Sequence, residues 1–272
     1  MTFFYALVNS LFDLLFRPFE RLPPILALLV FSLLTALLMI LAFRYMSNQR
    51  EIRRAKDRIQ AHLLEVRLFQ DQVGVVLRTY PRILRGTLVY LRHSLKPLTV
   101  MLVPLVLLLV QLEMRLGYRP LHPGESVLIA ARLAQPEALE AVALNVPPGL
   151  LLTAPPLRIP TEREVDWRIR GDQPGEYVVA VQLGDRAFPK RVVVSTRVAR
   201  TSPLRPRQNW WDQLLYPGEE PIAAGEAVEA IEVKYPPRTL SFGLFGADWL
   251  IPFFVISILA GYAMKGIFKT EF

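Results

Sequence analysis

Three runs of apolar residues stand out from the mixed polar and hydrophobic pattern of the chain, and they lie within residues 24–43, 98–113 and 248–272. The first run is about the 20 residues that a helix needs to cross a bilayer. The second run is shorter and contains Pro104, which membrane helices tolerate better than soluble helices do. A buried helix of a soluble protein is the alternative for the second run. The pattern therefore predicts three transmembrane helices.

The first 23 residues show helical periodicity. Leu7, Leu11 and Leu14 recur at spacings of three and four, while Asn9 and Asp13 fall elsewhere. This arrangement predicts that residues 1–23 form an amphipathic helix that lies in the outer membrane interface. A partly disordered N-terminus is the alternative.

Residues 44–97 carry two apolar stripes at helical spacing. The first stripe is Ile52, Ala55, Ile59, Leu63, Val66 and Phe69, and the second is Val73, Val76, Tyr80, Leu84, Leu88, Leu91 and Leu95. Two helices of similar length, joined near residues 71–74, predict an antiparallel hairpin whose stripes face each other as in a short coiled coil. Pro81 is expected to kink or restart the second helix.

Short segments rich in Val, Leu and Ile follow the second apolar run, with Pro and Gly between them. They lie at residues 126–133, 140–146, 149–154, 165–171, 175–183 and 190–198. Such segments predict an extracytoplasmic, Ig-like antiparallel β-sandwich at residues 114–200. The expected fold class is therefore an α+β membrane protein.

Residues 201–247 are expected to hold an interfacial helix and a strand that link the sandwich to the last span. Trp210 and Trp211 are adjacent in this linker, and Trp249 opens the third apolar run. Tryptophan favours the boundary between water and lipid, so these three residues are predicted interface anchors. Packing of the Trp210 and Trp211 rings against the sandwich is the alternative.

Charge gives the predicted membrane topology. The net charge is +8, and residues 44–96 hold twelve Lys and Arg but only four Asp and Glu. Positive loops close to membrane ends stay in the cytoplasm. We therefore expect a multi-pass protein of the cell (plasma or inner) membrane, with its N-terminus outside, residues 44–97 inside and its C-terminus in the cytoplasm.

Signatures of catalysis are missing from the sequence. It has no phosphate-binding loop, no dinucleotide fingerprint and no HExxH motif. The chain contains no cysteine, which excludes disulfides and thiolate metal sites. We therefore expect no enzymatic activity, no cofactor and no metal.

Two polar groups are candidates for binding. The basic hairpin face falls on a narrow arc of the second hairpin helix and consists of Arg78, Arg82, Arg85, Arg92 and Lys96. It could receive acidic polypeptides or ribosomal RNA, and a solvated or lipid-contacting face is the alternative. The groove candidates are Arg44, Asn48, Gln49, Arg50 and Gln111. A snorkelling anchor is the alternative for Arg44, and a bond between helices is the alternative for Gln111.

The stretches SNQREIRRAKDRIQ, LFQDQ and LKPLTVMLVPLVLLL follow one another from Ser47 to Leu109. This order of basic helix, polar break and proline-containing apolar run resembles the three-span branch of the YidC/Oxa1/EMC3/TMCO1-like insertase superfamily. The resemblance implies that the hairpin recruits substrate or ribosome and that a hydrophilic groove opens to the cytoplasm. Arg44 is then the closest counterpart of a positive residue in that groove. The outer sandwich between the second and third runs departs from the short connection of the three-span relatives.

Two functions follow from the sequence. The first is a membrane-protein insertase or biogenesis factor that uses the basic hairpin and a polar membrane groove. The alternative is a structural or accessory subunit of a larger envelope complex that docks through the β-sandwich. The expected partners are membrane lipids, nascent membrane proteins or the ribosome, and other membrane subunits, but not DNA.

Overall fold

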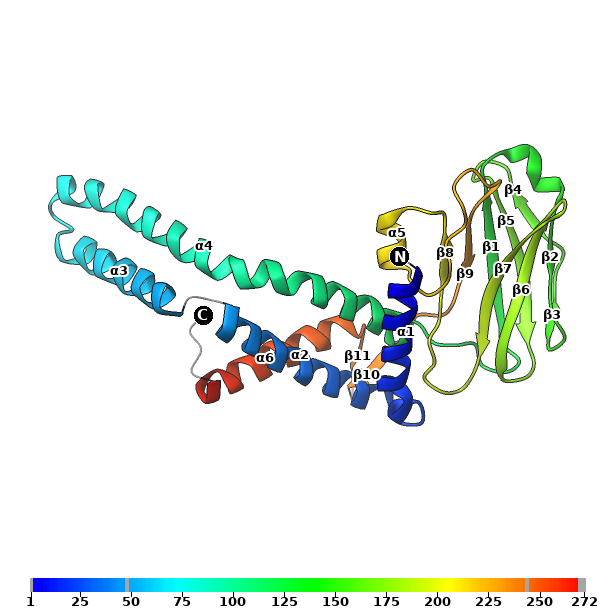
Figure 1. Cartoon of the computed structure of the whole chain (residues 1–272), viewed down its shortest axis with the longest axis horizontal. Coiled ribbons are helices and arrows are strands. Elements are labelled where there is room, and N and C mark those ends of the chain that lie inside the picture. The colour runs from blue at the N-terminus through cyan, green and yellow to red at the C-terminus, as the bar shows by residue number, and fades with distance from the viewer. Residues whose placement is uncertain (1, 47–48, 243–244, 269–272) are drawn as a thin grey trace. The chain divides into compact units, whose positions relative to one another are not determined.

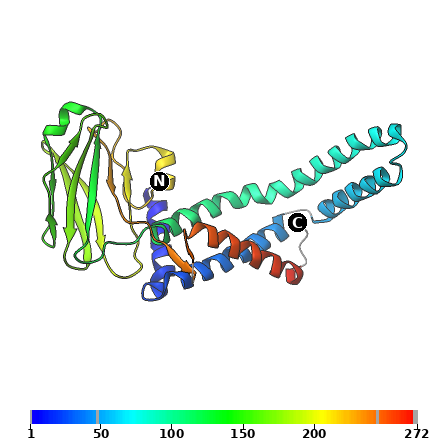
Figure 2. The same cartoon turned by 180° about the vertical axis from the view of Figure 1, so that it is seen from behind.

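The computed structural model describes residues 2–46, 49–242 and 245–268, and it has an α+β fold with antiparallel sheets (Figure 1). Figure 2 shows the same elements from behind. The chain divides into two compact units. One unit contains Met1–Leu28 and Leu107–Ile251, and the other contains Leu29–Val106 and Pro252–Phe272.

Two antiparallel sheets form most of the first unit. The larger sheet has the strand order β3-β5-β1-β9-β8, and β4 also pairs with β5. Its strands are β1 (Ser126–Leu133), β3 (Leu150–Leu152), β4 (Leu157–Ile159), β5 (Glu164–Gly171), β8 (Leu204–Pro206) and β9 (Val228–Val233). The smaller sheet has the order β2-β6-β7, and its strands are β2 (Val142–Asn145), β6 (Gly175–Leu183) and β7 (Arg186–Val194).

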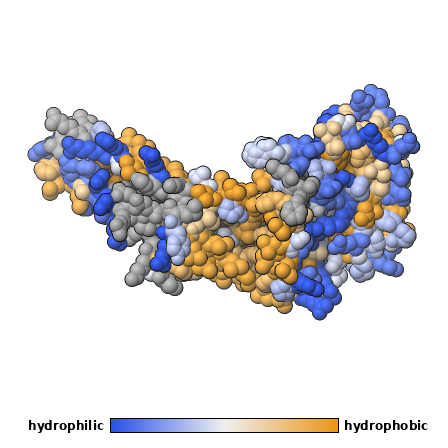
Figure 3. Space-filling view, viewed as in Figure 1, coloured by the Kyte–Doolittle hydropathy of each residue, from blue (hydrophilic) through white to orange (hydrophobic). Residues whose placement is uncertain are grey.

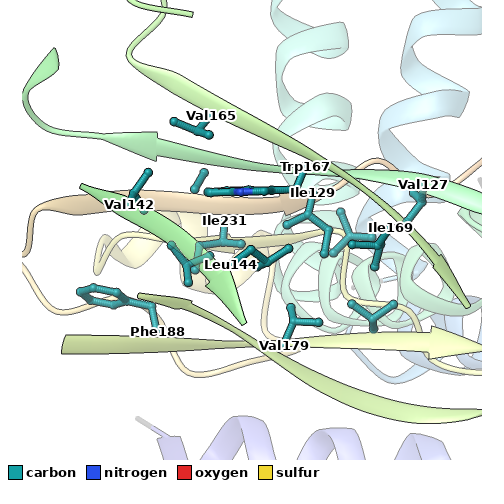
Figure 4. Packing of buried hydrophobic residues seen from close by; sticks show 14 of the residues in the cluster. Val127, Ile129, Val142, Leu144, Val165, Trp167, Ile169, Val179, Phe188 and Ile231 are labelled. Carbon is teal, nitrogen blue, oxygen red and sulfur yellow. The ribbon is translucent and has the colours of Figure 1, made fainter. Parts of the chain in front are cut away.

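Both sheets contribute to one hydrophobic core (Figure 4). Ile129 and Trp167 come from the larger sheet, and Leu144 and Val179 come from the smaller one. Alternate residues of a strand point to opposite faces, so each strand directs one set of apolar side chains into this shared core. Trp167 is 2% exposed, which makes its indole one of the larger buried groups of the core.

The larger sheet extends beyond the predicted sandwich boundary at residue 200. Strand β9 lies between β1 and β8, and its register places Val233 opposite Ile129. Strands β8 and β9, which follow residue 200, therefore belong to this sheet. The connection between β8 and β9 contains α5 (Trp210–Leu215).

Short elements complete the first unit. At its N-terminal end are α1 (Thr2–Phe16) and η1 (Arg17–Phe19). The π-helical turn η2 (Glu113–Gly117) precedes the sheets, and η3 (Pro136–Glu140) connects β1 to β2. A two-stranded ribbon of β10 (Leu240–Phe242) and β11 (Phe245–Ala247) follows β9.

Helices α2 (Pro24–Met46) and α6 (Leu250–Phe268) are apolar on all sides. In the second unit, the Ser257 hydroxyl on α6 donates a hydrogen bond of 3.2 Å to the Ser32 carbonyl oxygen on α2. Ser32 and Ala36 are buried, whereas Leu33 and Leu38 remain exposed. The buried side of α2 thus combines small residues with Phe31 and Ile40, and its exposed side carries leucines.

Helices α3 (Gln49–Leu68) and α4 (Val73–Leu112) run antiparallel, as the sequence predicted (Figure 1). The predicted α4 stripe, however, does not face α3. Thr79 is fully buried, and a Cβ built on Gly86 would lie 3.1 Å from Cγ1 of Ile59 on α3. The stripe of Tyr80, Leu84, Leu88, Leu91 and Leu95 is instead exposed. Small residues line the face of α4 that packs on α3, because they allow the backbones of the two helices to approach closely.

By length and composition, the helical segments Pro24–Tyr45 and Thr99–Gly117 could each cross a membrane, and Leu250–Gly266 is apolar but shorter. Figure 3 shows hydrophobic side chains at the surface over α2 and α6. Helix α4 is continuous through Pro81, so the helix does not restart there, and the expected kink stays a prediction. A single helix therefore joins the hairpin to the second apolar segment.

Candidate functional site

The predicted basic face lies beside the surface of α4 that packs on α3. Arg82, Arg85 and Arg92 are exposed on α4, and the side chains of Arg78 and Lys96 fall outside the described part of the structure. At 100° per residue, the five positions span an arc of roughly 80° around the helix. The described guanidinium groups are thus available to a partner that approaches this side of the hairpin.

One arginine of this face is paired within the hairpin. Nη1 of Arg82 lies 3.7 Å from Oε1 of Glu65 on α3, and Nδ1 of His62 lies 3.0 Å from Oε2 of the same carboxylate. The hydrogen bond from His62, with the nearby charge of Arg82, holds the pKa of Glu65 below its ordinary value. Arg85 and Arg92 form no ion pair with another described residue. They are the freer cations of the face.

The predicted groove residues do not assemble into one described site. The Arg44 guanidinium is exposed near the end of α2, 6.0 Å from the centre of the Tyr45 ring. Asn48 lies outside the described residues, and the side chains of Gln49 and Arg50 are also not described. Gln111 belongs to the other compact unit. Arg44 is therefore the one described side chain at the predicted mouth.

Gln111 bonds a neighbouring helix, the alternative that the sequence left open, within a buried polar network whose other members the sequence did not predict. Its Nε2 donates to Oδ1 of Asn9 at 2.7 Å, and its Oε1 accepts from Nη1 of Arg115 at 2.8 Å. Arg115 also pairs with Asp13, and Nη1 of Arg200 lies 2.9 Å from the other oxygen of that carboxylate. Arg115 is 1% exposed, so its charge depends on these partners. The network fastens α1 to the end of α4 and to η2.

Because of this network, α1 turns its polar side inward and its apolar side outward, which is the reverse of what a surface helix does in water. Asn9 is buried and its Nδ2 donates to the Pro217 carbonyl oxygen at 2.8 Å. Leu7, Leu11 and Leu14, in contrast, are 59%, 53% and 63% exposed. A helix at the surface of a soluble domain normally turns its apolar side inward. The inverted orientation suits contact with an apolar environment.

A cavity of 330 Å³ lies beside this network, and several charged groups line it. Four of them are guanidinium groups and three are carboxylates: Arg115, Arg191, Arg197, Arg200, Asp13, Glu20 and Glu176. Arg115 and Arg200 pair with Asp13, and Arg191 lies 3.8 Å from Glu176. Since three of the four cations are already paired, the cavity has little net charge to offer an anion.

A second buried polar group involves Lys190, which is fully buried. Its Nζ donates to the Ser202 carbonyl oxygen at 2.7 Å and pairs with Glu219. Burial lowers the pKa of Lys190 to about 8, although Glu219 acts in the opposite direction. Ser202 is only 3% exposed, so a substrate could not reach a serine and lysine pair here. This cluster fastens β7 to the segment around Ser202 and Glu219.

The three predicted anchor tryptophans differ in exposure. Trp210 and Trp211 on α5 stack with ring centres 3.9 Å apart, and both rings are more than half exposed. Trp249 is 2% exposed, and its Nε1 donates to Glu113 at 2.8 Å. Trp210 and Trp211 thus have the exposure that an interface anchor needs, whereas Trp249 packs inside the first unit.

The sequence contained a signal for the buried network. Asn9 and Asp13 are four residues apart in a mostly apolar helix, as are Gln111 and Arg115. Residues four apart share a face of a helix, so each pair could have been recognised as one polar patch. Their pairing across about 100 residues of chain could not be deduced from periodicity alone.

Among residues 2–46, 49–242 and 245–268, no group of three or more His, Asp and Glu side chains is arranged to hold a metal ion. No protein-family model, no curated protein and no solved structure matches the chain. The features that point to a function are therefore the chain's own surfaces and contacts.

Proposed function

We propose that this chain is a multi-pass membrane protein that inserts other membrane proteins or assists their biogenesis. In this proposal, the basic hairpin recruits the substrate in the cytoplasm. A polar groove whose mouth contains Arg44 then lowers the cost of moving polar segments into the bilayer. The resemblance to the three-span insertases is part of the proposal.

The exposure of α2 and α6 supports a membrane setting. On α2, Leu33, Leu34 and Leu38 are 50%, 45% and 56% exposed, and on α6, Ile258 and Leu259 are 56% and 64% exposed. In water, so large an exposed apolar surface would favour association, whereas in lipid these side chains need no cover. Small and hydroxylated residues on the buried side of α2 are also typical of membrane helix contacts.

The distribution of charge supports the orientation. The positive residues of segment 44–96 favour a cytoplasmic hairpin, which places the two sheets and α1 outside. The exposed leucines of α1 and the exposed Trp210 and Trp211 rings then suit the outer interface. The two sheets around one core are compatible with the proposed Ig-like sandwich.

The continuity of α4 carries the proposal of an insertion role. The same helix bears Arg85 and Arg92, which pair with no residue in the described part of the chain, and then becomes the apolar segment that begins at Thr99. Arg92 lies seven residues before Thr99, which is roughly 10 Å along a helix. An acidic polypeptide held on this face would lie next to the membrane surface, as recruitment requires.

Reconstituted vesicles provide the test. The purified chain is placed in vesicles, and insertion of a single-span protein with a short acidic N-terminal tail is followed by protease protection. Arg85→Glu/Arg92→Glu is compared with Arg58→Glu/Arg67→Glu, which makes the same charge change at exposed positions of α3. We expect the α4 variant to insert roughly five- to tenfold less substrate, because each exposed charge contact contributes up to about 1 kcal/mol.

Equal losses in the two variants would show that only the net charge matters and would contradict a specific recruiting face. Insertion equal to that of protein-free vesicles would reject the insertase function itself. Arg44→Glu tests the proposed groove separately. It should slow insertion of the acidic tail but leave a neutral tail unaffected, because only the acidic tail would be repelled.

An accessory-subunit function is the second candidate, and one surface favours it. Leu151 and Leu152 on β3 and Leu157 on β4 are exposed, and both strands pair with the same edge of β5. An apolar patch at a sheet edge is a common docking surface. Gentle purification of Leu151→Asp/Leu157→Asp should lose a bound subunit that the Val178→Asp control retains. A chain that purifies alone in every case would contradict this function.

A further inference from the structure

Helix α4 contains an uninterrupted leucine repeat. Leucine occupies residues 84, 88, 91, 95, 98, 102 and 105, with spacings that alternate strictly between four and three. We call these seven residues the leucine seam. This repeat averages 3.5 residues, which is the period that keeps one stripe facing a partner helix along a left-handed coiled coil.

The described part of the seam has little cover within the chain. Leu84, Leu88 and Leu91 are 63%, 58% and 46% exposed, and Leu95 and Leu102 are 44% and 55% exposed. The side chain of Leu98 is not described. Leu84, Leu88, Leu91 and Leu95 precede the apolar segment that begins at Thr99, so lipid does not account for their exposure.

Helix α3 packs on a different side of α4. With Leu88 and Leu95 at heptad position a, Leu84 and Leu91 take position d. The buried Thr79 and the partly buried Gly86, which lies against Ile59 of α3, take position f. Position f lies on the side of a helix opposite to a and d. The hairpin contact therefore leaves Leu84, Leu88, Leu91 and Leu95 of the leucine seam exposed, while Leu105 is partly buried.

The two prolines that lie within the length of the seam point away from it, whereas Pro81, at position a, comes before the first seam leucine. Pro97 and Pro104 are seven residues apart, and both take position c of the heptad. Position c, like f, points away from the a and d positions. The close approach that a partner helix needs is thus not blocked by either ring.

The residues beside the seam specify a parallel partner. Arg85 and Arg92 take position e on one flank, and Tyr80 and Thr87 take position g on the other. In a parallel pair of identical helices, position e of one chain meets position g of the other. Arg85 would then meet the partner's Tyr80, which permits a cation–π contact. An antiparallel pair would instead place arginines against arginines.

We propose that α4 forms a parallel two-helix coiled coil with α4 of a second copy of this chain along the leucine seam. A second copy carries the matching stripe with the same length and period, and two copies inserted alike in one membrane have parallel α4 helices. Larger assemblies would cover more of the flanks that carry Arg85 and Arg92, which disfavours them. The proposal does not depend on an insertion activity.

Disulfide crosslinking in native membranes tests the proposal directly, because the chain has no cysteine of its own. Single variants Leu84→Cys, Leu88→Cys, Leu91→Cys and Leu95→Cys are oxidised and compared with Val89→Cys. Val89 is also exposed, but it takes position b. We expect the four seam variants to give a product of twice the 31.0 kDa chain and Val89→Cys to remain a single chain.

A second measurement uses uncrosslinked protein. Leu88→Lys/Leu91→Lys is compared with Val89→Lys by the mass of the detergent-solubilised chain over a range of concentrations. Burying two ammonium groups at the seam should weaken dimerisation at least roughly hundredfold, while Val89→Lys should dimerise like the wild type. Far-UV circular dichroism equal to that of the wild type would show that the α3–α4 hairpin still folds.

Several results would overturn the proposal. Crosslinking at one seam position alone would indicate an antiparallel pair. Products from Val89→Cys equal to those from Leu88→Cys would indicate random collision. An adduct with a different protein, a trimer, or a wild-type chain that is monomeric at every concentration would each exclude the two-helix assembly.

Discussion

The sheets of the first unit keep most of their large apolar side chains inside, whereas the apolar helices of the second bury some, such as Phe31 and Ile40, and expose many others. In the sheets, Trp167 and Ile129 lie inside a shared core. On α2, Ser32 and Ala36 are buried while Leu33 is half exposed. Side chains become buried when the surrounding medium solvates them poorly. The contrast is what the proposed membrane setting would require, with water around the sheets and lipid around α2 and α6.

The largest effect should come from the core of the sheets. Trp167→Ala would remove a fully packed indole and should lower the free energy of unfolding by about 4 kcal/mol. Leu33→Ala, on the exposed side of α2, should change it by less than about 1 kcal/mol in detergent, which solvates that side in either variant. Denaturant unfolding followed by circular dichroism measures both. Equal losses would break the contrast between the two regions.

The buried network at α1 should be nearly as sensitive. Asp13→Ala removes the carboxylate that pairs with the buried Arg115, and we expect a loss of roughly 3 kcal/mol, because an uncompensated charge stays in the interior. Glu137→Ala removes an exposed carboxylate and should cost less than about 0.5 kcal/mol. Thermal unfolding in detergent gives the stabilities, and proteolysis near residue 16 reports release of α1. An intact α1 in Asp13→Ala would show that the network is dispensable.

A charge on each exposed apolar surface separates the two solvents most directly. Leu34 on α2 and Leu151 on β3 are 45% and 49% exposed. Leu34→Arg should cost about 3 kcal/mol of membrane integration, since Leu34 lies near the middle of the proposed span. Leu151→Arg should change little, because water surrounds that surface. Resistance to alkaline extraction from membranes measures integration, and equal integration of the two variants would place α2 in water.

Acid should weaken the sheet unit through one ion pair. Nη1 and Nη2 of Arg119 each lie 2.7 Å from an oxygen of Glu125, and this pairing lowers the pKa of Glu125 to about 2. A lowered folded-state pKa stabilises the fold above the ordinary value near 4.5, and that stability is lost as the pH falls towards 2. We expect a loss of roughly 1–2 kcal/mol, since both groups are partly exposed.

Urea unfolding at pH 6 and pH 3 measures this loss, and Glu125→Gln serves as the control. The wild type should lose more stability over this pH interval than the variant does, by the amount that the pair contributes. An identical loss of stability in both proteins would show that groups other than Glu125 cause the acid sensitivity.

Periodicity predicted the local elements well. The segment 126–133 is strand β1 and the segment 175–183 is strand β6, because a half-buried strand alternates apolar and polar residues. The hairpin of α3 and α4 was likewise predicted from its two stripes. The third apolar run corresponds to α6, although its place in a membrane stays a prediction.

The hydrophobic pattern did not predict the contacts between segments that lie far apart in the sequence. The pairing of β9 with β1, which carries the sheet past residue 200, joins segments about 100 residues apart. The α4 face that packs on α3 was predicted wrongly, because the strongest hydrophobic stripe was assumed to find its partner within the chain. Close packing at Gly86 decided otherwise. The groove remains a prediction, since the side chains of Asn48, Gln49 and Arg50 are not described.

The bond between Asn9 and Pro217 has a consequence for synthesis. These residues are 208 positions apart, so at ordinary translation rates roughly 10–40 s pass before the second partner leaves the ribosome. During that interval α1 has emerged without the side chains that later hold it. In the proposed membrane setting, the exposed leucines of α1 would hold the newly made helix at the membrane surface until Pro217 emerges. The attachment of α1 would then be one of the last steps in the maturation of the chain.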